Sequence, residues 1–393
     1  MRIAIKAVQT AQGGGLTHLN KIIEWFGKLA PEREFLLLGK TGQESLFIPA
    51  PANFRYLFYR LPGLHLAAQI WWERQALPAL LSRLKCDLLF EPGNRGTLHS
   101  PCPKISLMHN IAPFDSEYLK WETPYQKLRQ SLLRKATIAS MESSQGIIFL
   151  SNYSKRLFSK YIDLSGKKTV VIYHGRLQND HQDAVIPAKY GIAGRFLLSV
   201  SHIWRYKKIL EMVKCYIAAL EKERDLPPLV IAGTDYSPSY TKEIERVIER
   251  AGAGELIRLI GTVAESDLPA FYRNCQAFLF PSVIEACPNI LIEAMSCGCA
   301  VACSNRGVVP EITAGAAVYF DPDDIADFSA KIISIATDSH LRQSLARSSR
   351  NRARYFSWEK ASRQSLSFFD DILELGQPLG AKDRKPELAK VEA

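Results

Sequence analysis

Short apolar runs alternate along the chain with longer stretches in which apolar residues recur every three or four positions. The runs have the length of strands and are almost wholly apolar, as at 2–8, 35–39, 87–93, 104–110, 146–151 and 169–175. The stretches at 16–30 and 152–162 have the period of a helix. Strands that are apolar on both faces and are followed by helices predict a parallel sheet with helices on both sides.

The same alternation restarts after a polar connector at 178–194, with apolar runs at 196–201, 229–233, 256–261, 277–282 and 300–304. A chain of 393 residues is too long for one ordinary core. The pattern therefore predicts an α/β protein of two Rossmann-like, doubly wound domains that face each other across a cleft. We expect the domains to span 1–185 and 186–357, followed by a helix at 358–376 and a disordered tail at 377–393.

Positive charge is concentrated in the first half of the chain. The net charge is +10; residues 1–190 hold 25 Lys and Arg against 14 Asp and Glu, and the remainder holds 25 against 26. This asymmetry has two interpretations. Either the N-terminal half faces an anionic partner such as a membrane surface, or the charge serves solubility alone. We expect no nucleic-acid partner.

The sequence predicts neither a membrane-spanning segment nor a metal site. No window holds eighteen consecutive apolar residues, and the apolar stretch at the N-terminus is too short for a secretory signal, so we expect a cytoplasmic protein. The eight cysteines form no paired CxxC elements, which predicts reduced thiols. Asp321-Pro322-Asp323-Asp324 fits a helix N-terminus, with proline at the first helical position, better than a metal site.

Two segments at strand ends are suited to an anionic ligand. Gly14 and Gly15 precede a helix, where a backbone without side chains can approach an anion closely, although a plain turn explains them too. Arg205, Lys207 and Lys208 follow the run at 196–201, where clustered cations suit a phosphate or diphosphate. The alternative for these cations is a solvated surface.

A histidine and two acids complete the candidate chemistry. His109 directly follows the apolar run at 105–108, where it can donate to a hydroxyl in the cleft, unless it is a buried structural residue; His174 is a weaker candidate of the same kind. Glu285 and Glu293 flank a helix start at Pro288, whose free N–H groups suit a phosphate. Two acids around a phosphate site favour a nucleotide sugar. A glycosidase pair and structural caps stay open as alternatives.

The chain resembles the retaining glycosyltransferases of family 4, from the first predicted strand to about Trp358. The most specific part is E-x7-E with Pro-Asn at the helix start, formed by Glu285, Pro288, Asn289 and Glu293. AMSCG and the strand AVACS follow it. The supporting features are the Gly14-Gly15 turn, His109, the SNYSK stretch from Ser151, the segments RYKK and GTVAESDLPAFYRNC, and FSWEKA at 356–361.

The resemblance implies the GT-B fold, no cofactor, and a nucleoside diphosphate sugar as donor substrate. The C-terminal domain would bind this donor, the N-terminal domain would bind the acceptor, and the helix at 358–376 would return to the N-terminal domain. Glu285 would contact hydroxyls of the donor sugar, and Glu293 would contact the ribose. The remaining residues that the resemblance assigns to the site are His109, Lys207, Gly14, Gly15, Asn289, Ile290 and Leu291. Many members have arginine where His202 stands, so we expect Arg205 to supply the second cation.

The activity implied is transfer of a hexose, with retained anomeric configuration, to a hydroxyl of a saccharide or of a polyprenyl- or lipid-linked saccharide. Such a step belongs to polysaccharide or lipopolysaccharide biosynthesis. Two other classes stay open. One is a nucleotide-sugar epimerase or phosphorylase of the same fold, and the other is a non-catalytic protein that binds sugar nucleotides.

The stretch from Tyr118 to Lys135 mixes large apolar side chains with basic ones. This composition suits peripheral contact with anionic lipid at the inner face of the cell membrane. A buried amphipathic helix with one solvated face fits the same pattern.

Overall fold

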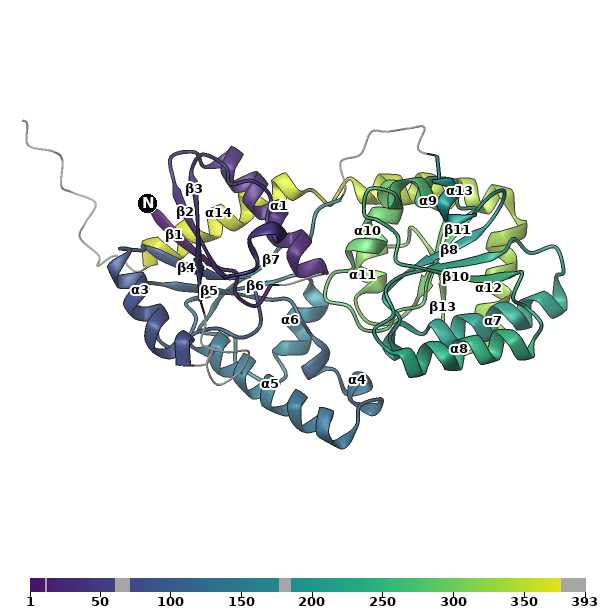
Figure 1. Cartoon of the computed structure of the whole chain (residues 1–393), viewed down its shortest axis with the longest axis horizontal. Helices are drawn as coiled ribbons and strands as arrows, with labels where there is room; N and C mark the ends of the chain where they lie inside the picture. The colour runs from purple at the N-terminus through teal and green to yellow at the C-terminus, as the bar shows by residue number, and fades with distance from the viewer. Residues whose placement is uncertain (11–12, 61–70, 177–184, 376–393) are drawn as a thin grey trace, which may run out of the picture.

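Two parallel sheets organise the chain (Figure 1). A computed structural model describes residues 1–10, 13–60, 71–176 and 185–375. The first sheet has the strand order β3-β2-β1-β4-β5-β6-β7, and the second has the order β10-β9-β8-β11-β12-β13. All paired strands among the described residues are parallel. The predicted α/β fold of two doubly wound domains is therefore confirmed.

The first sheet and its helices occupy the N-terminal half. Its strands are β1 Arg2–Lys6, β2 Glu34–Lys40, β3 Phe54–Tyr59, β4 Leu88–Glu91, β5 Lys104–Met108, β6 Gly146–Phe149 and β7 Lys168–Val171. Its helices are α1 Gly14–Leu29, α3 Leu77–Arg83, α4 Ser116–Lys120, α5 Pro124–Glu142 and α6 Asn152–Phe158. Short turns of other helix types are η1 Glu44–Leu46, η2 Trp72–Ala76 and η3 Ala112–Phe114.

The second sheet repeats this plan. Its strands are β8 Leu197–Val200, β9 Leu229–Ala232, β10 Ile257–Gly261, β11 Ala277–Phe280, β12 Val301–Ser304 and β13 Val318–Phe320. Its helices are α7 Ile209–Lys222, α8 Pro238–Arg250, α9 Leu268–Asn274, α10 Asn289–Ser296, α11 Val309–Thr313, α12 Ile325–Thr337 and α13 Ser339–Ala353. The 3-10 turns are η4 Ala188–Tyr190 and η5 Arg205–Lys207, and α14 Trp358–Leu375 comes last.

The apolar runs correspond to strands, with two informative differences. The pattern does not predict β3, which lies at the sheet edge and is only partly buried after Phe54, so it lacks the uniform burial of an interior strand. The run at 2–8 is longer than β1, which ends at Lys6. Lys6 is buried, because it belongs to a charged network at the end of the strand.

A network of buried charges joins the last residues of β1 and β4 to the first residue of β5. The ammonium of Lys6 lies 3.1 Å from carboxylates of both Glu73 and Glu91, and the ammonium of Lys104 lies 3.6 Å from Glu91. Lys104 also donates to the carbonyl of Ser140 at 2.9 Å. Burial, the largest influence, lowers the pKa of Lys104 to about 8, against the opposing effect of Glu91. Four buried charged side chains beside the neighbouring strands β1, β4 and β5 are stable only because they are paired.

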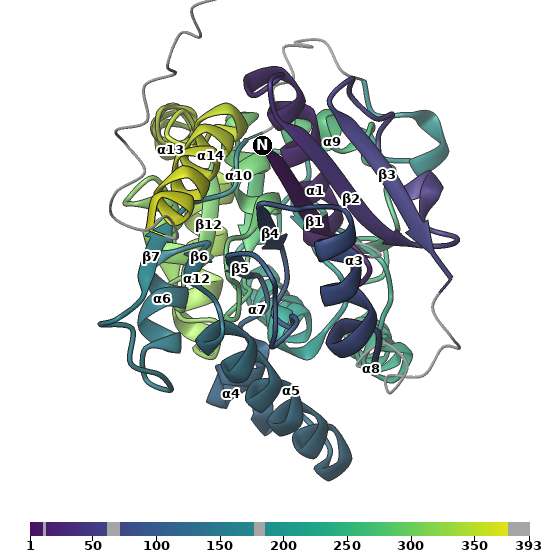
Figure 2. The same cartoon turned by 90° about the vertical axis from the view of Figure 1, so that its left-hand side faces the viewer.

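The last helix crosses from the C-terminal half back to the N-terminal half. In Figures 1 and 2, α14 lies beside α1, although the two are at opposite ends of the sequence. The ring of Phe369 packs against Phe26 of α1 and Phe90 of β4, with centroid distances of 5.7 and 5.1 Å. Arg33 forms an ion pair with Asp370 at 2.9 Å.

Polar contacts also join the halves near the cleft. The carboxylate of Glu311, on α11, accepts from the backbone N–H groups of Asn152 and Tyr153 at 2.7 and 2.8 Å. These groups are at the first turn of α6, where the helix dipole favours a negative charge. Arg306 forms a second link, with Glu117 of α4, at 3.3 Å.

Two predictions from the sequence concern residues outside the described ranges. The tail expected at 377–393 lies wholly beyond them. The domain boundary expected near 185 falls at the end of 177–184, which are also outside, so its position stays a prediction.

Replacing Lys104 by methionine should destabilise the protein strongly. Glu91 would lose a buried cation, and the Ser140 carbonyl would lose its charged donor. Breaking one side of a buried charged network costs about 3–5 kcal/mol. Urea unfolding followed by circular dichroism would measure the loss, with Lys135→Met, an exposed lysine of α5, as the matched control. Equal unfolding midpoints for the two variants would contradict this expectation.

Candidate functional site

The strand order places two loops side by side at the carboxyl edge of the second sheet. β8 and β11 are neighbours, but their connections run in opposite directions along the sheet. The loop after β8 carries Lys207, and the loop after β11 carries Glu285. This switch point is where open α/β sheets bind ligands.

Lys207 and Glu285 form an ion pair at this switch point. The Lys207 side chain is 9% exposed, and the hydroxyl of Ser282 donates to the same oxygen of Glu285 at 2.8 Å. Burial opposes the charged form of Lys207, but the Glu285 carboxylate outweighs it, so the pKa of Lys207 is raised. The structure thus brings together a predicted cation and a predicted acid that are 78 positions apart in the sequence.

The structure does not bring Arg205 into this group. Its guanidinium pairs with Glu243 of α8 at 2.9 Å and lies over the ring of Tyr240, and the side chain is 46% exposed. His202 is instead within electrostatic reach of both members of the pair. Burial and the charge of Lys207 lower the pKa of His202, and Glu285 opposes them.

The helix start predicted at Pro288 is present, with one correction. Pro288 is the N-cap, and α10 begins at Asn289, so the proline precedes the first helical residue instead of occupying it. This arrangement leaves the first-turn N–H groups, including those of Asn289, Ile290 and Leu291, without partners in their own helix. The side-chain oxygen of Asn289 contacts Nδ1 of His174, which reaches α10 from the end of the first sheet.

Glu293 lies inside α10 in a partly buried setting. The hydroxyl of Tyr272 donates to its carboxylate at 3.4 Å. Burial and the neighbouring charge of Glu265 raise the pKa of Glu293 to about 7, although the Tyr272 hydrogen bond opposes this. Glu285 and Glu293 therefore differ in setting: the first faces a cation, and the second faces a phenol and another acid.

On the other side of the cleft, the glycine turn lies against His109 and α10. A Cβ at Gly14 would lie 3.5 Å from Nδ2 of Asn289, and one at Gly15 would lie 3.7 Å from Nε2 of His109. Asn94 fixes the end of β5, because its side-chain oxygen accepts from the backbone N–H of His109 at 3.0 Å. The structure therefore places close together four residues that the sequence predicts in one site: Gly14, Gly15, His109 and Asn289.

Two further histidines join His109 at this convergence. The rings of His18 and His174 have centroids 5.0 Å apart and lie 6.1 and 5.6 Å from that of His109. Burial is the main cause that lowers the pKa of each ring. The rings are therefore neutral near pH 7, and each offers one donor and one acceptor. The sequence analysis misses His18, whose only signal is its place one turn after Gly15 in α1.

Two cavities adjoin these residues. One, of about 140 Å³, lies at the carboxyl ends of β8, β9 and β10, with Val200, Gly233, Val263 and Ile290 in its wall. The other, of about 280 Å³, lies between the halves, and its walls include Tyr118 and Trp121 from one half and Trp204 and Tyr206 from the other.

The acidic segment 321–324 has a structural role. Asp324 caps α12 by accepting from the N–H groups of Ala326 and Asp327, so the cap follows Pro322 by two residues and the proline is not the first helical residue. Asp321 and Asp323 pair with Arg306 at 2.7 and 2.9 Å. Within the described ranges, no three His, Cys, Asp or Glu residues are grouped to hold a metal ion.

Comparison with known proteins identifies the type of enzyme. Residues 182–352 match the family described as "Glycosyl transferases group 1". O-antigen chain mannosyltransferase B of Escherichia coli is 26% identical over 272 residues, which cover 67% of this chain and 69% of that protein. The serotype-specific mannosyltransferase WbdA of Escherichia coli is 24% identical over 72% of this chain. The match covers only 35% of the length of WbdA.

A solved structure shows the same architecture. HepE from Anabaena, in complex with UDP-glucose, superposes with a TM-score of 0.71 at 17% identity, over 94% of this chain and all of HepE. The chain therefore has the GT-B fold. The family match and the mannosyltransferase relatives, and not this structure, indicate that the chain is a glycosyltransferase enzyme.

Glu293→Gln should remove a pH dependence of stability. A carboxyl with a raised pKa keeps its proton in the folded state at a pH where the unfolded chain has lost it. Its contribution to stability is therefore present at low pH and is lost as the pH rises through about 7. Urea unfolding at several pH values should show that the wild type loses up to about 1.4 kcal/mol per pH unit more than the variant between pH 5 and 7. Equal slopes for the wild type, Glu293→Gln and the exposed control Glu249→Gln would contradict this.

Proposed function

We propose that the enzyme transfers a hexose, with retained anomeric configuration, from a nucleoside diphosphate sugar to a hydroxyl of a saccharide or lipid-linked saccharide. The observation that carries the proposal is the buried pair of Lys207 and Glu285, opposite the glycine turn and His109. In this proposal, the reaction serves the assembly of polysaccharide or lipopolysaccharide at the inner face of the cell membrane.

The diphosphate binds between Lys207 and the start of α10. The first-turn N–H groups of α10, of Asn289, Ile290 and Leu291, donate to its oxygens, and the backbone of Gly15 approaches from the other domain. The absence of a side chain at Gly14 and Gly15 leaves room for this approach. The leaving diphosphate gains negative charge as its bond to the sugar breaks. These donors therefore stabilise the transition state more than the ground state.

The hexose lies between Glu285 and His109. The Glu285 carboxylate pairs with Lys207 and accepts a hydrogen bond from Ser282. A bound diphosphate draws the ammonium of Lys207 toward itself, and the Glu285 carboxylate then accepts from sugar hydroxyls. His109, which is neutral, has Nε2 buried without a hydrogen-bond partner and can donate to or accept from the sugar.

The nucleoside lies beside β8, β9 and β10. The cavity of about 140 Å³ is next to Ile290 of α10, and its walls are largely apolar, which suits a base. Glu293, on the same helix, accepts from the ribose hydroxyls. Glu293 must be ionised to accept from both hydroxyls, so donor binding should favour the deprotonated form of Glu293.

Bond exchange occurs on one face of the sugar. The bond between the anomeric carbon and the phosphate oxygen breaks, and the acceptor oxygen bonds to the same face. The acceptor's proton passes to the leaving phosphate oxygen, so no enzyme nucleophile is consumed. The mannosyltransferase relatives favour mannose as the hexose.

Transfer assays with substituted enzymes test the assignments. Lys207→Met and Glu285→Gln should each lower kcat by about a hundredfold or more, because each removes a charge at the reacting centre. Arg205→Met should stay within about threefold of the wild type, since Arg205 faces Glu243. A loss with Arg205→Met as large as that with Lys207→Met would show that Arg205 turns to the donor as the second cation.

The donor for these assays comes from a thermal-shift screen of UDP-, GDP- and ADP-hexoses. A donor at a hundred times its Kd stabilises the fold by about 2.7 kcal/mol. Product analysis then separates transfer from epimerisation and phosphorolysis, because only transfer requires the acceptor. A protein that is stabilised by a donor but transfers from none would contradict the proposed reaction.

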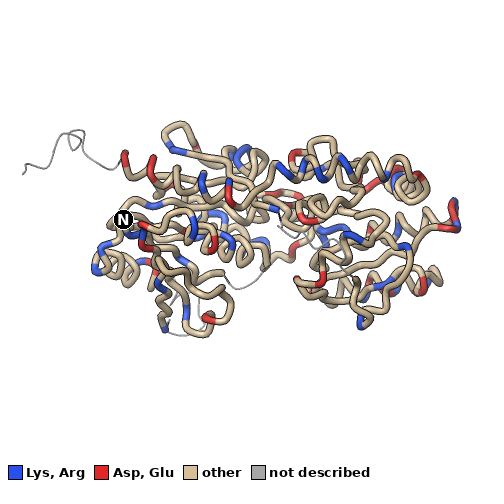
Figure 3. Tube along the Cα trace, turned by 90° about the horizontal axis from the view of Figure 1, so that it is seen from above, with Lys and Arg blue, Asp and Glu red and all other residues tan. Residues whose placement is uncertain are grey.

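The exposed face of α5 suits contact with a membrane. Tyr125, Leu128 and Leu132 are 76%, 61% and 59% exposed, and their spacing puts them on one face of the helix. Lys127 and Arg129 are exposed beside them. In Figure 3, both basic and acidic positions occur in each half, so the apolar face of α5 is more specific support for membrane contact than the net charge of the N-terminal half.

Leu128→Glu combined with Leu132→Glu should therefore reduce binding to vesicles that contain phosphatidylglycerol. Co-sedimentation should show a drop of about tenfold, because two large apolar groups leave the lipid and two negative charges approach an anionic surface. Leu375→Glu, at an exposed leucine of α14, is the control and should bind as the wild type does. Unchanged binding of the double variant would rule out α5 as the contact.

A further inference from the structure

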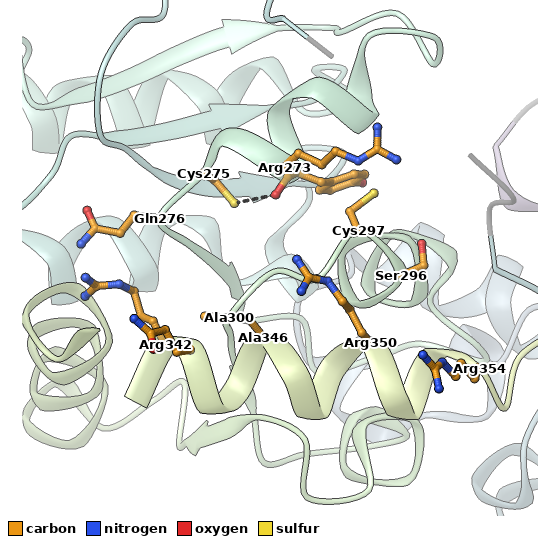
Figure 4. A pocket seen from close by; sticks show the side chains of 13 residues that line it. Arg273, Cys275, Gln276, Ser296, Cys297, Ala300, Arg342, Ala346, Arg350 and Arg354 are labelled. Atoms are coloured by element: carbon orange, nitrogen blue, oxygen red, sulfur yellow. Dashed lines mark hydrogen bonds between the residues drawn. The ribbon is translucent and has the colours of Figure 1, made fainter. Parts of the chain in front are cut away.

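The C-terminal half contains a second concave site, outside the cleft. It is a pocket of about 890 Å³ between α9, α10 and α13. This volume lies within the range of small-molecule sites, roughly 300–1,000 Å³. Figure 4 shows four arginines around it: Arg273 from α9, and Arg342, Arg350 and Arg354 along and just after α13.

Two of these arginines, Arg350 and Arg354, have no carboxylate partner among the described residues. None of the described residues that line the pocket is acidic. Arg342 is partly engaged, because it donates to the carbonyls of Ile335 and Ala336 at the end of α12 at 3.0 and 2.7 Å. Arg350 and Arg354 form no ion pair with any described part of the chain, and both are exposed.

The guanidinium of Arg350 lies against a glycine. A Cβ at Gly298 would lie only 2.1 Å from Nε of Arg350, and Gly298 has a φ of 81°, which favours glycine. Gly298 follows the C-terminal end of α10, where the helix dipole attracts a cation. The backbone therefore makes room for this guanidinium at the pocket wall, whereas an ordinary surface arginine would extend freely into solvent.

The chemistry of the wall suits a phosphate group. Clustered cations in a concave site raise the local concentration of anions. The planar fork of each guanidinium matches phosphate oxygens and can donate two parallel hydrogen bonds. Ser296, Gln276 and Gln343 add neutral polar groups around the arginines. A site lined in this way favours a hydrated anion over an apolar ligand.

We propose that this pocket binds a soluble small molecule that carries phosphate, at a site distinct from that of the donor. The position of the pocket favours a soluble ligand over a lipid headgroup. In both Figure 1 and Figure 2, α5 lies at the lower edge of the molecule and α13 at the upper edge. A membrane in contact with α5 would therefore not reach the pocket.

Calorimetric titration of the full chain with inorganic pyrophosphate tests this proposal. The titrations use Lys207→Met, which the proposed function expects to weaken binding in the cleft. They are made at constant ionic strength because exposed charges are screened by salt. Adding Arg350→Gln and Arg354→Gln to this variant should raise the Kd for pyrophosphate at least tenfold. Adding Arg347→Gln instead should change the Kd by less than twofold, because Arg347 is an exposed arginine of α13 that does not line the pocket.

Three results would overturn the proposal. The first is an absence of pyrophosphate binding to Lys207→Met. The second is an equal loss of pyrophosphate-binding free energy per substituted arginine for Arg347→Gln and for the pair of pocket substitutions, which would mean that net charge alone is responsible. The third is loss of binding to phosphatidylglycerol vesicles, with unchanged pyrophosphate binding, when Arg350 and Arg354 are replaced; that result would identify a lipid headgroup. Unchanged unfolding midpoints would show that the substitutions leave the fold intact.

Discussion

Parallel pairing of the strands is the constraint on which the rest of the structure depends. Because each strand must return through a crossover, the carboxyl ends of all strands in a sheet lie at one edge. The order of strands then decides which loops meet there. In the second sheet, β8 and β11 are neighbours at the point where the order reverses. This arrangement places Lys207 beside Glu285, and it explains how a buried lysine finds its carboxylate across a long stretch of sequence.

The second requirement is that the two sheets keep a fixed relation. The contact of α14 with α1, the carboxylate of Glu311 at the start of α6, and the contact between His174 and Asn289 all cross between the halves. Their result is that the glycine turn after β1 faces the start of α10. The buried histidines lie at this junction. Burial keeps their rings neutral, so they can line the cleft without opposing the positive charge that a diphosphate needs.

The two charged sites differ in how their cations are balanced. The second half of the chain has a net charge near zero. Lys207 is paired and buried, whereas Arg350 and Arg354 are exposed and form no ion pair with the part of the chain that the structure describes. A paired cation keeps its position until a ligand replaces its partner, which suits a site that must exchange substrate and product. An unbalanced group of arginines attracts an anion without any exchange of partners. Overall charge therefore says little about where either kind of site is located.

The sequence by itself determined the alternation of strands and helices, and hence the two doubly wound domains, because buried parallel strands must be apolar on both faces. It also predicted Lys207, Glu285, Asn289 and His109 as site residues, because the ends of apolar runs and the starts of helices are where polar groups can serve a ligand. Only the tertiary structure decided that Arg205 faces Glu243, that His18 joins the other histidines, and that Lys6 belongs to a buried charged network. The arginine pocket likewise depends on packing between α9, α10 and α13. The physical reason is the same in each case: these contacts join residues that are distant in the sequence, and local periodicity carries no information about such partners.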